Sequence, residues 1–142
     1  MSMNAMAPPI CLWSVSRWLA GALIPATWYL QAQKFRRWSR DRVRELFSQV
    51  DIILAPTTPC PAPLIGQTTL MLDRQEVPLR PNVGLYTQPL SLIGLPIISV
   101  PVQRPGQLPL GIQVIAAPYN EALVLRVAAY LETQGIVSAP VP

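Results

Sequence analysis

The chain has 142 residues, the size of one ordinary domain, and 51% of its residues are hydrophobic whereas only 13% are charged. The net charge of +4 is mild and is concentrated between Lys34 and Arg44, which argues against a diffuse nucleic-acid-binding surface. Because the sequence has no histidine and only Cys11 and Cys60 as cysteines, it lacks the usual zinc patterns and any histidine-dependent triad, so we expect no metal, no cofactor and a reduced, cytoplasmic setting.

The sequence predicts neither a signal peptide nor a membrane-spanning helix. Residues 1–14 have no basic region of the kind that opens a signal peptide, and we treat them as a tail of uncertain origin ahead of a domain at 15–142. The uncharged span Pro81–Gln103 is long enough to cross a bilayer, but prolines and glycines interrupt it. Unpaired backbone groups in lipid are costly, so we expect no association with a membrane.

From Ser16 to Val50 the apolar residues recur at steps of three and four, which predicts helix. Pro25 should kink this helix or divide it in two. In the second half a basic run faces away from the apolar stripe, and Arg37 and Asp41 are spaced for an exposed ion pair. We interpret this basic run as a solvated helix face. A helix lying on a membrane surface is a weaker alternative, because the polar face also carries acidic residues.

A short apolar strand after Val50 runs into a proline-rich loop that ends at Pro63. The prolines stiffen the loop, so the hydroxyls of Thr57 and Thr58 are held where the strand ends, a common place for pocket walls in α/β sheets. An alternative left open is that the two threonines only satisfy the loop backbone. Cys60 is a poor candidate for a nucleophile, because the sequence offers no histidine or other obvious base to activate its thiol.

The central part of the sequence predicts two paired strands. Residues 64–83 form a connection that includes a short hairpin around Asp73. The β-branched runs Pro96–Val102 and Leu110–Ala116 are near-continuously apolar, as in strands covered on both faces, and Gln103–Gln107 has the composition of a reversing turn. With few polar groups, this stretch is typical of scaffold.

A helix is predicted from Asn120, as its N-cap, to Gln134, with Gly135 placed to end it. The expected fold class is therefore α/β, in the order helix, strand, loop, strand, strand, helix. The sequence shows no internal repeat and no glycine-rich phosphate loop.

Four segments in this order resemble the C-terminal third of the amidase signature family over residues 17–132. They are YLQAQKFRRW (29–38), DIILAPTTPCPAPLIG (51–66), LYTQPLSLIGLPIISVPV (85–102) and LPLGIQVIAAPYNEALVLRVAAYLE (108–132). The resemblance implies a C-terminal fragment of an amidase domain, in which strands complete a mixed sheet flanked by helices. It further implies that this chain supplies a wall of the substrate pocket, with Thr57, Thr58 and Tyr86 as weak candidates for that wall.

The family hydrolyses amides with a lysine, a serine preceding a cis peptide bond and a nucleophilic serine, all in a Gly/Ser-rich core N-terminal to the region seen here. This chain has a single lysine, Lys34, and no Gly-Ser-Ser-Gly run, so no catalytic residue carries over. The resemblance therefore implies a truncated or split amidase that needs the missing core or another protein chain. We expect the chain alone to be inactive and to self-associate.

Two pocket positions can be compared individually with the family. Some members have an arginine four residues before a glycine in the helix preceding the YLQAQ segment, where it binds the substrate carboxylate, and Arg17 matches it. The same members have an aspartate that contacts the substrate's amino group where this chain has Gly84. The resemblance thus implies a small carboxylated amide or urea derivative of the 1-carboxybiuret type rather than free glutamine.

Two functions from different classes remain open. The favoured one is an amidohydrolase that cleaves C–N bonds, of which this chain is the C-terminal portion. The alternative is a non-catalytic interaction module, or truncated pseudoenzyme, whose apolar surface binds a partner chain.

Overall fold

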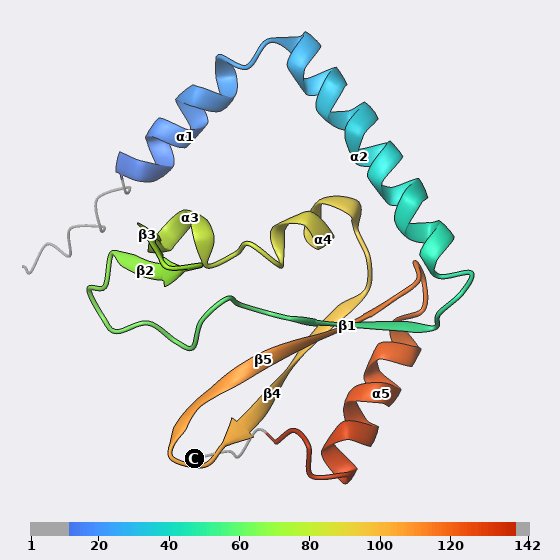
Figure 1. Ribbon diagram of the computed structural model, residues 1–142. Helices are drawn as coiled ribbons and strands as arrows, with labels where there is room; N and C mark the ends of the chain where they lie inside the picture. Colours follow the sequence, from blue (N-terminus) through green and yellow to red (C-terminus); the bar gives the residue numbers. More distant parts are fainter. Residues whose placement is uncertain (1–11, 139–142) are drawn as a thin grey trace, which may run out of the picture. The chain divides into compact units, whose positions relative to one another are not determined.

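The computed structural model describes residues 12–138, and Figure 1 shows the order of their helices and strands. Residues 1–11, which include Cys11 and most of the predicted tail 1–14, lie outside the described residues. The chain divides into two compact units, Met1–Arg36 and Arg37–Pro142. Within the described part of the chain, no helix combines the length and the apolarity needed to cross a membrane.

Two helices, α1 (Leu12–Ala22) and α2 (Ala26–Leu46), confirm the predicted division at Pro25. The Pro25 carbonyl accepts a hydrogen bond from the Trp28 amide at 2.9 Å in the first turn of α2. Its ring nitrogen carries no hydrogen that could continue α1, so proline is tolerated only where a new helix begins. Helix α1 begins before Ser16, the expected start of the helical pattern.

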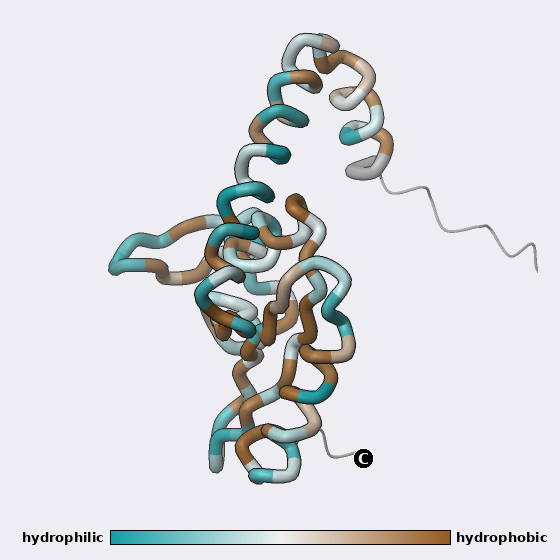
Figure 2. Tube along the Cα trace, turned by 90° about the vertical axis from the view of Figure 1, so that its right-hand side faces the viewer, coloured by the Kyte–Doolittle hydropathy of each residue, from teal (hydrophilic) through white to brown (hydrophobic). Residues whose placement is uncertain are grey.

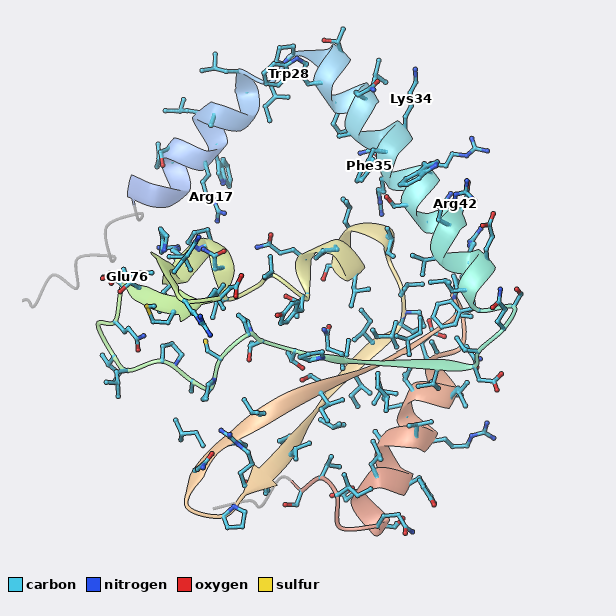
Figure 3. All side chains as sticks on the ribbon, in the orientation of Figure 1. Arg17, Trp28, Lys34, Phe35, Arg42 and Glu76 are labelled. Atoms are coloured by element: carbon cyan, nitrogen blue, oxygen red, sulfur yellow. The ribbon has the colours of Figure 1, made fainter. Side chains whose placement is uncertain are left out.

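Helix α2 exposes both aromatic and basic side chains, and none of its residues is buried. Hydrophilic and hydrophobic residues alternate along it (Figure 2), and Lys34 and Phe35 point to different sides (Figure 3). Trp28 is 70% exposed. The predicted ion pair between Arg37 and Asp41 is present at 3.8 Å with both side chains well exposed, so it adds at most a few tenths of a kcal/mol.

Three antiparallel strands form the main sheet in the order β1-β5-β4, and they are β1 (Ile52–Pro56), β4 (Ile97–Arg104) and β5 (Gln107–Ala116). Strand β5 is central, and its Val114 pairs with Leu54 of β1 and with Ile98 of β4. The β4–β5 pair is the predicted hairpin. Gly106 in its turn has a φ of 69°, a conformation that glycine adopts without steric cost.

Helix α5 (Glu121–Thr133) covers one face of this sheet and builds the core of its unit (Figure 1). The buried residues of that core are Val100, Val114, Ala116, Val124 and Val137. The helix ends at Gly135 as predicted. Gly135 has a φ of 67°, and the next amide, of Ile136, donates to the Leu131 carbonyl at 3.0 Å, which is the Schellman arrangement.

The predicted cap at the start of α5 is only partly correct. Asn120 is the N-cap residue, but its side chain makes no capping hydrogen bond. Its ψ of 42° departs from the extended backbone that usually aims an N-cap side chain at the first free amides. The predicted boundary is therefore right and the predicted side-chain interaction is wrong.

A small hairpin and two short helices connect β1 to β4. The hairpin pairs β2 (Thr69–Leu72) with β3 (Gln75–Pro78), and its turn residues Asp73 and Arg74 have φ values of 46° and 62°, as a type I′ turn requires. This hairpin was predicted. Helices α3 (Leu79–Asn82) and α4 (Gln88–Ile93) were not predicted, because the expected order passed from a loop directly to the strands.

Candidate functional site

A small polar cluster lies on the face of the sheet opposite α5, where β1 ends. Side chains alternate along a strand, so Ser99 and Gln113 face away from the core that holds their neighbours Val100 and Val114. Thr57 directly follows β1, and its hydroxyl oxygen lies 2.7 Å from that of Ser99, a hydrogen bond in which either group can donate. Because Ser99 is exposed, this hydroxyl pair is open to solvent.

The two hydroxyls meet across Gly111 of the central strand, where only glycine leaves enough room. A Cβ atom at this position would lie 2.7 Å from the Thr57 hydroxyl oxygen and 3.0 Å from the Ser99 hydroxyl oxygen. The Thr57 amide also donates to the Gly111 carbonyl at 2.9 Å, which fixes the chain as it leaves β1. The need for glycine here is one of space, since its φ is outside the positive range.

Gln113 connects this cluster to the segment that carries Tyr86. Its side-chain nitrogen donates to the Pro56 carbonyl at 2.8 Å and to the Tyr86 carbonyl at 3.4 Å, the second bond being long and correspondingly weak. The Gln113 side chain is 2% exposed, whereas Tyr86 is 39% exposed. Thr57 and Tyr86, both predicted as pocket-wall residues, are therefore held on the same side of the sheet.

Thr58 belongs to a different environment. Its hydroxyl donates to the Cys60 carbonyl at 2.7 Å, which is the loop-satisfying role left open for it. With Leu54 and Ile112, among other residues, it lines an apolar cavity of about 350 Å³ on the α5 side of the sheet. Cys60 is a half-buried free thiol in the same loop.

Arg17, the candidate for carboxylate binding, lies exposed on α1 (Figure 3). It belongs to the first unit, whereas the cluster of Thr57, Ser99 and Gln113 belongs to the second. Gly84, which stands where some relatives have aspartate, packs closely on Gln88: an added Cβ would lie 3.0 Å from the Gln88 side-chain nitrogen. Among residues 12–138, no group of three His, Cys, Asp or Glu side chains is arranged to hold a metal ion.

Sequence reasoning missed three residues of the cluster: Ser99, Gly111 and Gln113. It assigned their stretch to scaffold because the surrounding residues are apolar. The available signal was the interruption of a β-branched run by Gly111 and Gln113, since a glycine inside a strand often marks a close approach and a buried amide needs partners.

Comparisons with known proteins agree over most of the chain. Residues 10–125 match the sequence model of the Amidase family. The chain is 46% identical over 126 residues to AtzE, the 1-carboxybiuret hydrolase subunit of Pseudomonas sp. (strain ADP), covering 87% of this chain and 27% of that protein. It is 41% identical over 105 residues to the fatty acid amide hydrolase of Medicago truncatula, covering 73% of this chain and 17% of that protein. A further relative is the glutamyl-tRNA(Gln) amidotransferase of Myxococcus xanthus (strain DK1622), of which one component is 39% identical over 108 residues, covering 75% of this chain and 21% of that component.

Solved structures give the same result. One structure, of a vestigial protein complex that reveals the evolutionary origins of an s-triazine catabolic enzyme, matches with a TM-score of 0.82 and 43% identity over 91% of this chain and 29% of the other. An amidase crystal structure matches with a TM-score of 0.75 and 29% identity over 82% of this chain and 27% of the other. The chain thus spans between 17% and 29% of the length of these proteins.

Proposed function

The chain belongs to the amidase signature family, and on that premise we propose that it acts as the C-terminal portion of an amidohydrolase that cleaves C–N bonds of a small carboxylated amide or urea derivative. The observation that carries the proposal is the 46% identity to a 1-carboxybiuret hydrolase subunit over 87% of this chain. The sheet face described above supports it, because a solvent-open pair of hydroxyls at a strand end is suited to bind polar groups of a substrate.

In this proposal the chain contributes structure and binding, and the catalytic groups come from the N-terminal core of the family. Lys34, its only lysine, lies exposed on α2, and the Cys60 thiol has no histidine in the sequence to act as its base. Thr57 and Tyr86 would form part of the pocket wall. Thr58 would support the loop that carries Thr57.

Arg17 is the residue we propose for recognition of the substrate carboxylate. A guanidinium can hold a carboxylate through two parallel hydrogen bonds, and such charge-assisted bonds are stronger in a partly dry pocket than on a surface. Glycine rather than aspartate at position 84 fits a substrate without an ammonium group. Together these two residues favour a carboxylated urea over free glutamine.

The proposed partners are the missing core and a second protein chain. The relative from Pseudomonas is named as one subunit of an enzyme, and one of the matching solved structures is a protein complex. The cytoplasmic setting expected from the cysteine content is part of the same proposal. No nucleic-acid or membrane partner is included.

The alternative function is that of a non-catalytic module that binds a partner chain. The favourable observation is the apolar cavity on the α5 side, beside which Leu54 remains 57% exposed in the middle of a strand. An apolar surface of this kind is usual at a protein interface. It is equally what an amidase sheet would present toward the rest of its own domain.

The decisive experiment is a chimera in which this chain replaces the matching segment of the Pseudomonas relative. If Arg17 binds the carboxylate, Arg17→Leu should lose about 1.5–3 kcal/mol, seen mainly as a raised KM for 1-carboxybiuret. Arg17→Lys should fall in between, because it keeps the charge but loses the paired hydrogen bonds.

Arg42→Leu is the matched control, since Arg42 is exposed on α2 and pairs only at the surface with Glu45 at 3.1 Å. An Arg17→Leu chimera that loses equal activity toward an uncharged amide would assign Arg17 a structural role. No loss at all would remove it from the pocket.

A further inference from the structure

Gln113 is the only buried polar side chain among the residues whose side chains the structure describes, 15–138. It lies in the central strand between Ile112 and Val114, in a run that is otherwise apolar. Buried amide groups are retained where their hydrogen bonds are made, so the partners of Gln113 indicate what it does.

The side-chain nitrogen of Gln113 donates its hydrogen bonds to backbone carbonyls of two distant segments. Pro56 accepts at 2.8 Å and Tyr86 at 3.4 Å, and these residues lie 57 and 27 positions away in the sequence. Pro56 ends β1 and immediately precedes Thr57, whereas Tyr86 belongs to no strand. Strand pairing therefore does not join these two segments, and a side chain takes that role.

We propose that Gln113 is a positioning residue of the substrate pocket, which holds the Thr57 segment and the Tyr86 segment at a fixed separation. This inference rests on the proposed amidase function. Gln113 itself faces no open space, so it acts through the residues that it holds. Its loss should displace the two pocket segments while leaving the β4–β5 pairing in place.

Gln103 provides a matched control within the same chain. Its side-chain nitrogen donates at 2.8 Å to the carbonyl of Ser138, so it is another amide that ties down a distant backbone segment. Gln103 is exposed and lies away from Thr57 and Tyr86 in the chain. Gln103→Leu and Gln113→Leu remove the same chemical groups from two different segments.

Hydrogen exchange on the full chain tests the tie without any need for catalysis. In Gln113→Leu, amides of residues 57–58 and 84–88 should exchange at least about tenfold faster than in the wild type, while amides shared by β4 and β5 keep their protection. In Gln103→Leu the acceleration should appear near Ser138 instead. Unchanged exchange at 84–88, or a uniform increase over the sheet, would overturn the proposal.

Gln113→Glu separates hydrogen bonding from packing because the two side chains have nearly the same shape. An ionised carboxyl can donate to neither carbonyl, whereas a protonated one has a single O–H donor. Burial beside carbonyl oxygens raises the pKa of the introduced carboxyl, so its ionisation destabilises the fold above its unfolded-state pKa and the effect disappears as the pH falls below it.

Compared with the wild type at each pH, Gln113→Glu should therefore recover protection at 84–88 between about pH 8 and pH 4, the range that brackets the ordinary carboxyl pKa. Gln113→Leu should not recover. If both variants behave alike at the two pH values, the hydrogen bonds are irrelevant and the proposal fails.

The chimera then links the tie to the pocket. Gln113→Leu should reduce kcat/KM at least about tenfold, the size of effect that a displaced substrate-binding wall produces. Val114→Ala, on the opposite face of the same strand, should leave kcat/KM unchanged in the protein that remains folded. If exchange at 84–88 rises but kcat/KM does not fall, Gln113 is a purely structural tie. Exchange results stand even if the chimera is inactive, so failure of the proposed function is recognised separately.

Discussion

Replacing Gly111 by alanine tests the geometry of the hydroxyl pair most sharply. The added Cβ would lie 2.7 Å from the Thr57 hydroxyl oxygen, 2.8 Å from the Thr57 Cβ and 3.0 Å from the Ser99 hydroxyl oxygen. Contacts this short force the strand end and its hydroxyl pair apart. Because the φ of Gly111 is not positive, alanine can adopt its backbone conformation, and the expected effect is purely steric.

The expected cost follows from three terms. Overpacking costs about 1–3 kcal/mol, and separating the Thr57 and Ser99 hydroxyls removes a hydrogen bond worth about 1 kcal/mol. Alanine gains about 0.5–1 kcal/mol over glycine because it restricts the unfolded chain. The net prediction for Gly111→Ala is a loss of about 1.5–3 kcal/mol in the free energy of unfolding.

Urea unfolding followed by circular dichroism measures this loss. With an m-value of about 1.5 kcal/mol/M, the midpoint should fall by about 1–2 M. Gly21→Ala is the matched control, since no atom lies within 4 Å of its added Cβ and the residue is inside α1. That substitution should be neutral or slightly stabilising, because alanine is a better helix former than glycine.

A second substitution identifies the clashing partner. Thr57→Gly removes both Thr57 atoms that the new Cβ would meet, so Gly111→Ala should cost at least about 1 kcal/mol less in that background than in the wild type. Thr57→Ala keeps the Cβ contact at 2.8 Å and should relieve less. If Gly111→Ala leaves the urea midpoint unchanged, Thr57 and Ser99 do not meet over the central strand and the described site is wrong.

Two further predictions concern the stability and association of the chain. Gly135→Ala should cost about 1–2 kcal/mol through backbone strain alone, because the residue has a φ of 67° and no neighbour within 4 Å of an added Cβ, and thermal unfolding would show it as a lowered Tm. Gly135→Asn should cost less, and equal effects of the two substitutions would contradict a strain-based loss. The purified chain should also self-associate through its apolar surfaces, including the exposed Leu54, which sedimentation velocity would detect as a rise in sedimentation coefficient with concentration. Pairing at the edge strand β4 should contribute less, because Pro101 has no amide hydrogen to donate and its carbonyl is already bonded to the Ser138 amide at 3.2 Å, so a concentration-independent monomer would refute the association.

Local features of the fold could be predicted because each has a local cause. The break at Pro25, the type I′ turn at Asp73 and Arg74 and the helix end at Gly135 all depend on residues that restrict their own backbone. The two strands of the central hairpin were recognisable from composition and an intervening Pro-Gly turn. The family itself was recognisable from four ordered segments, and the family match over residues 10–125 confirms it.

Helix α4 shows why other features were missed. Its signals were present, with Pro89 in the first turn and Gly94 ending the helix at a φ of 72°, but the segment is too short for periodicity to be visible. The neighbouring strand pattern was therefore extended over it.

The site could not be predicted because it depends on contacts between distant residues. Thr57 and Ser99 are 42 positions apart, and only the pairing of both β1 and β4 with β5 brings them together. The same alternation places Thr58 in a different environment from Thr57, although the two are adjacent in sequence. Register decides which side chains share a face, and register is not readable from one sequence.

The central claim is that this chain supplies one part of an amidase and depends on the family's core for catalysis. Hydrolysis of 1-carboxybiuret by the purified chain and by the chimera, compared in one assay, tests it most directly. We predict that the chain alone shows no turnover above background and that the chimera retains kcat/KM within about tenfold of its parent, a difference of about 1.4 kcal/mol or less in transition-state stabilisation. A chimera with the parent's circular dichroism and oligomeric state but no measurable hydrolysis would contradict the claim, as would turnover by the chain alone that disappears in Cys60→Ala.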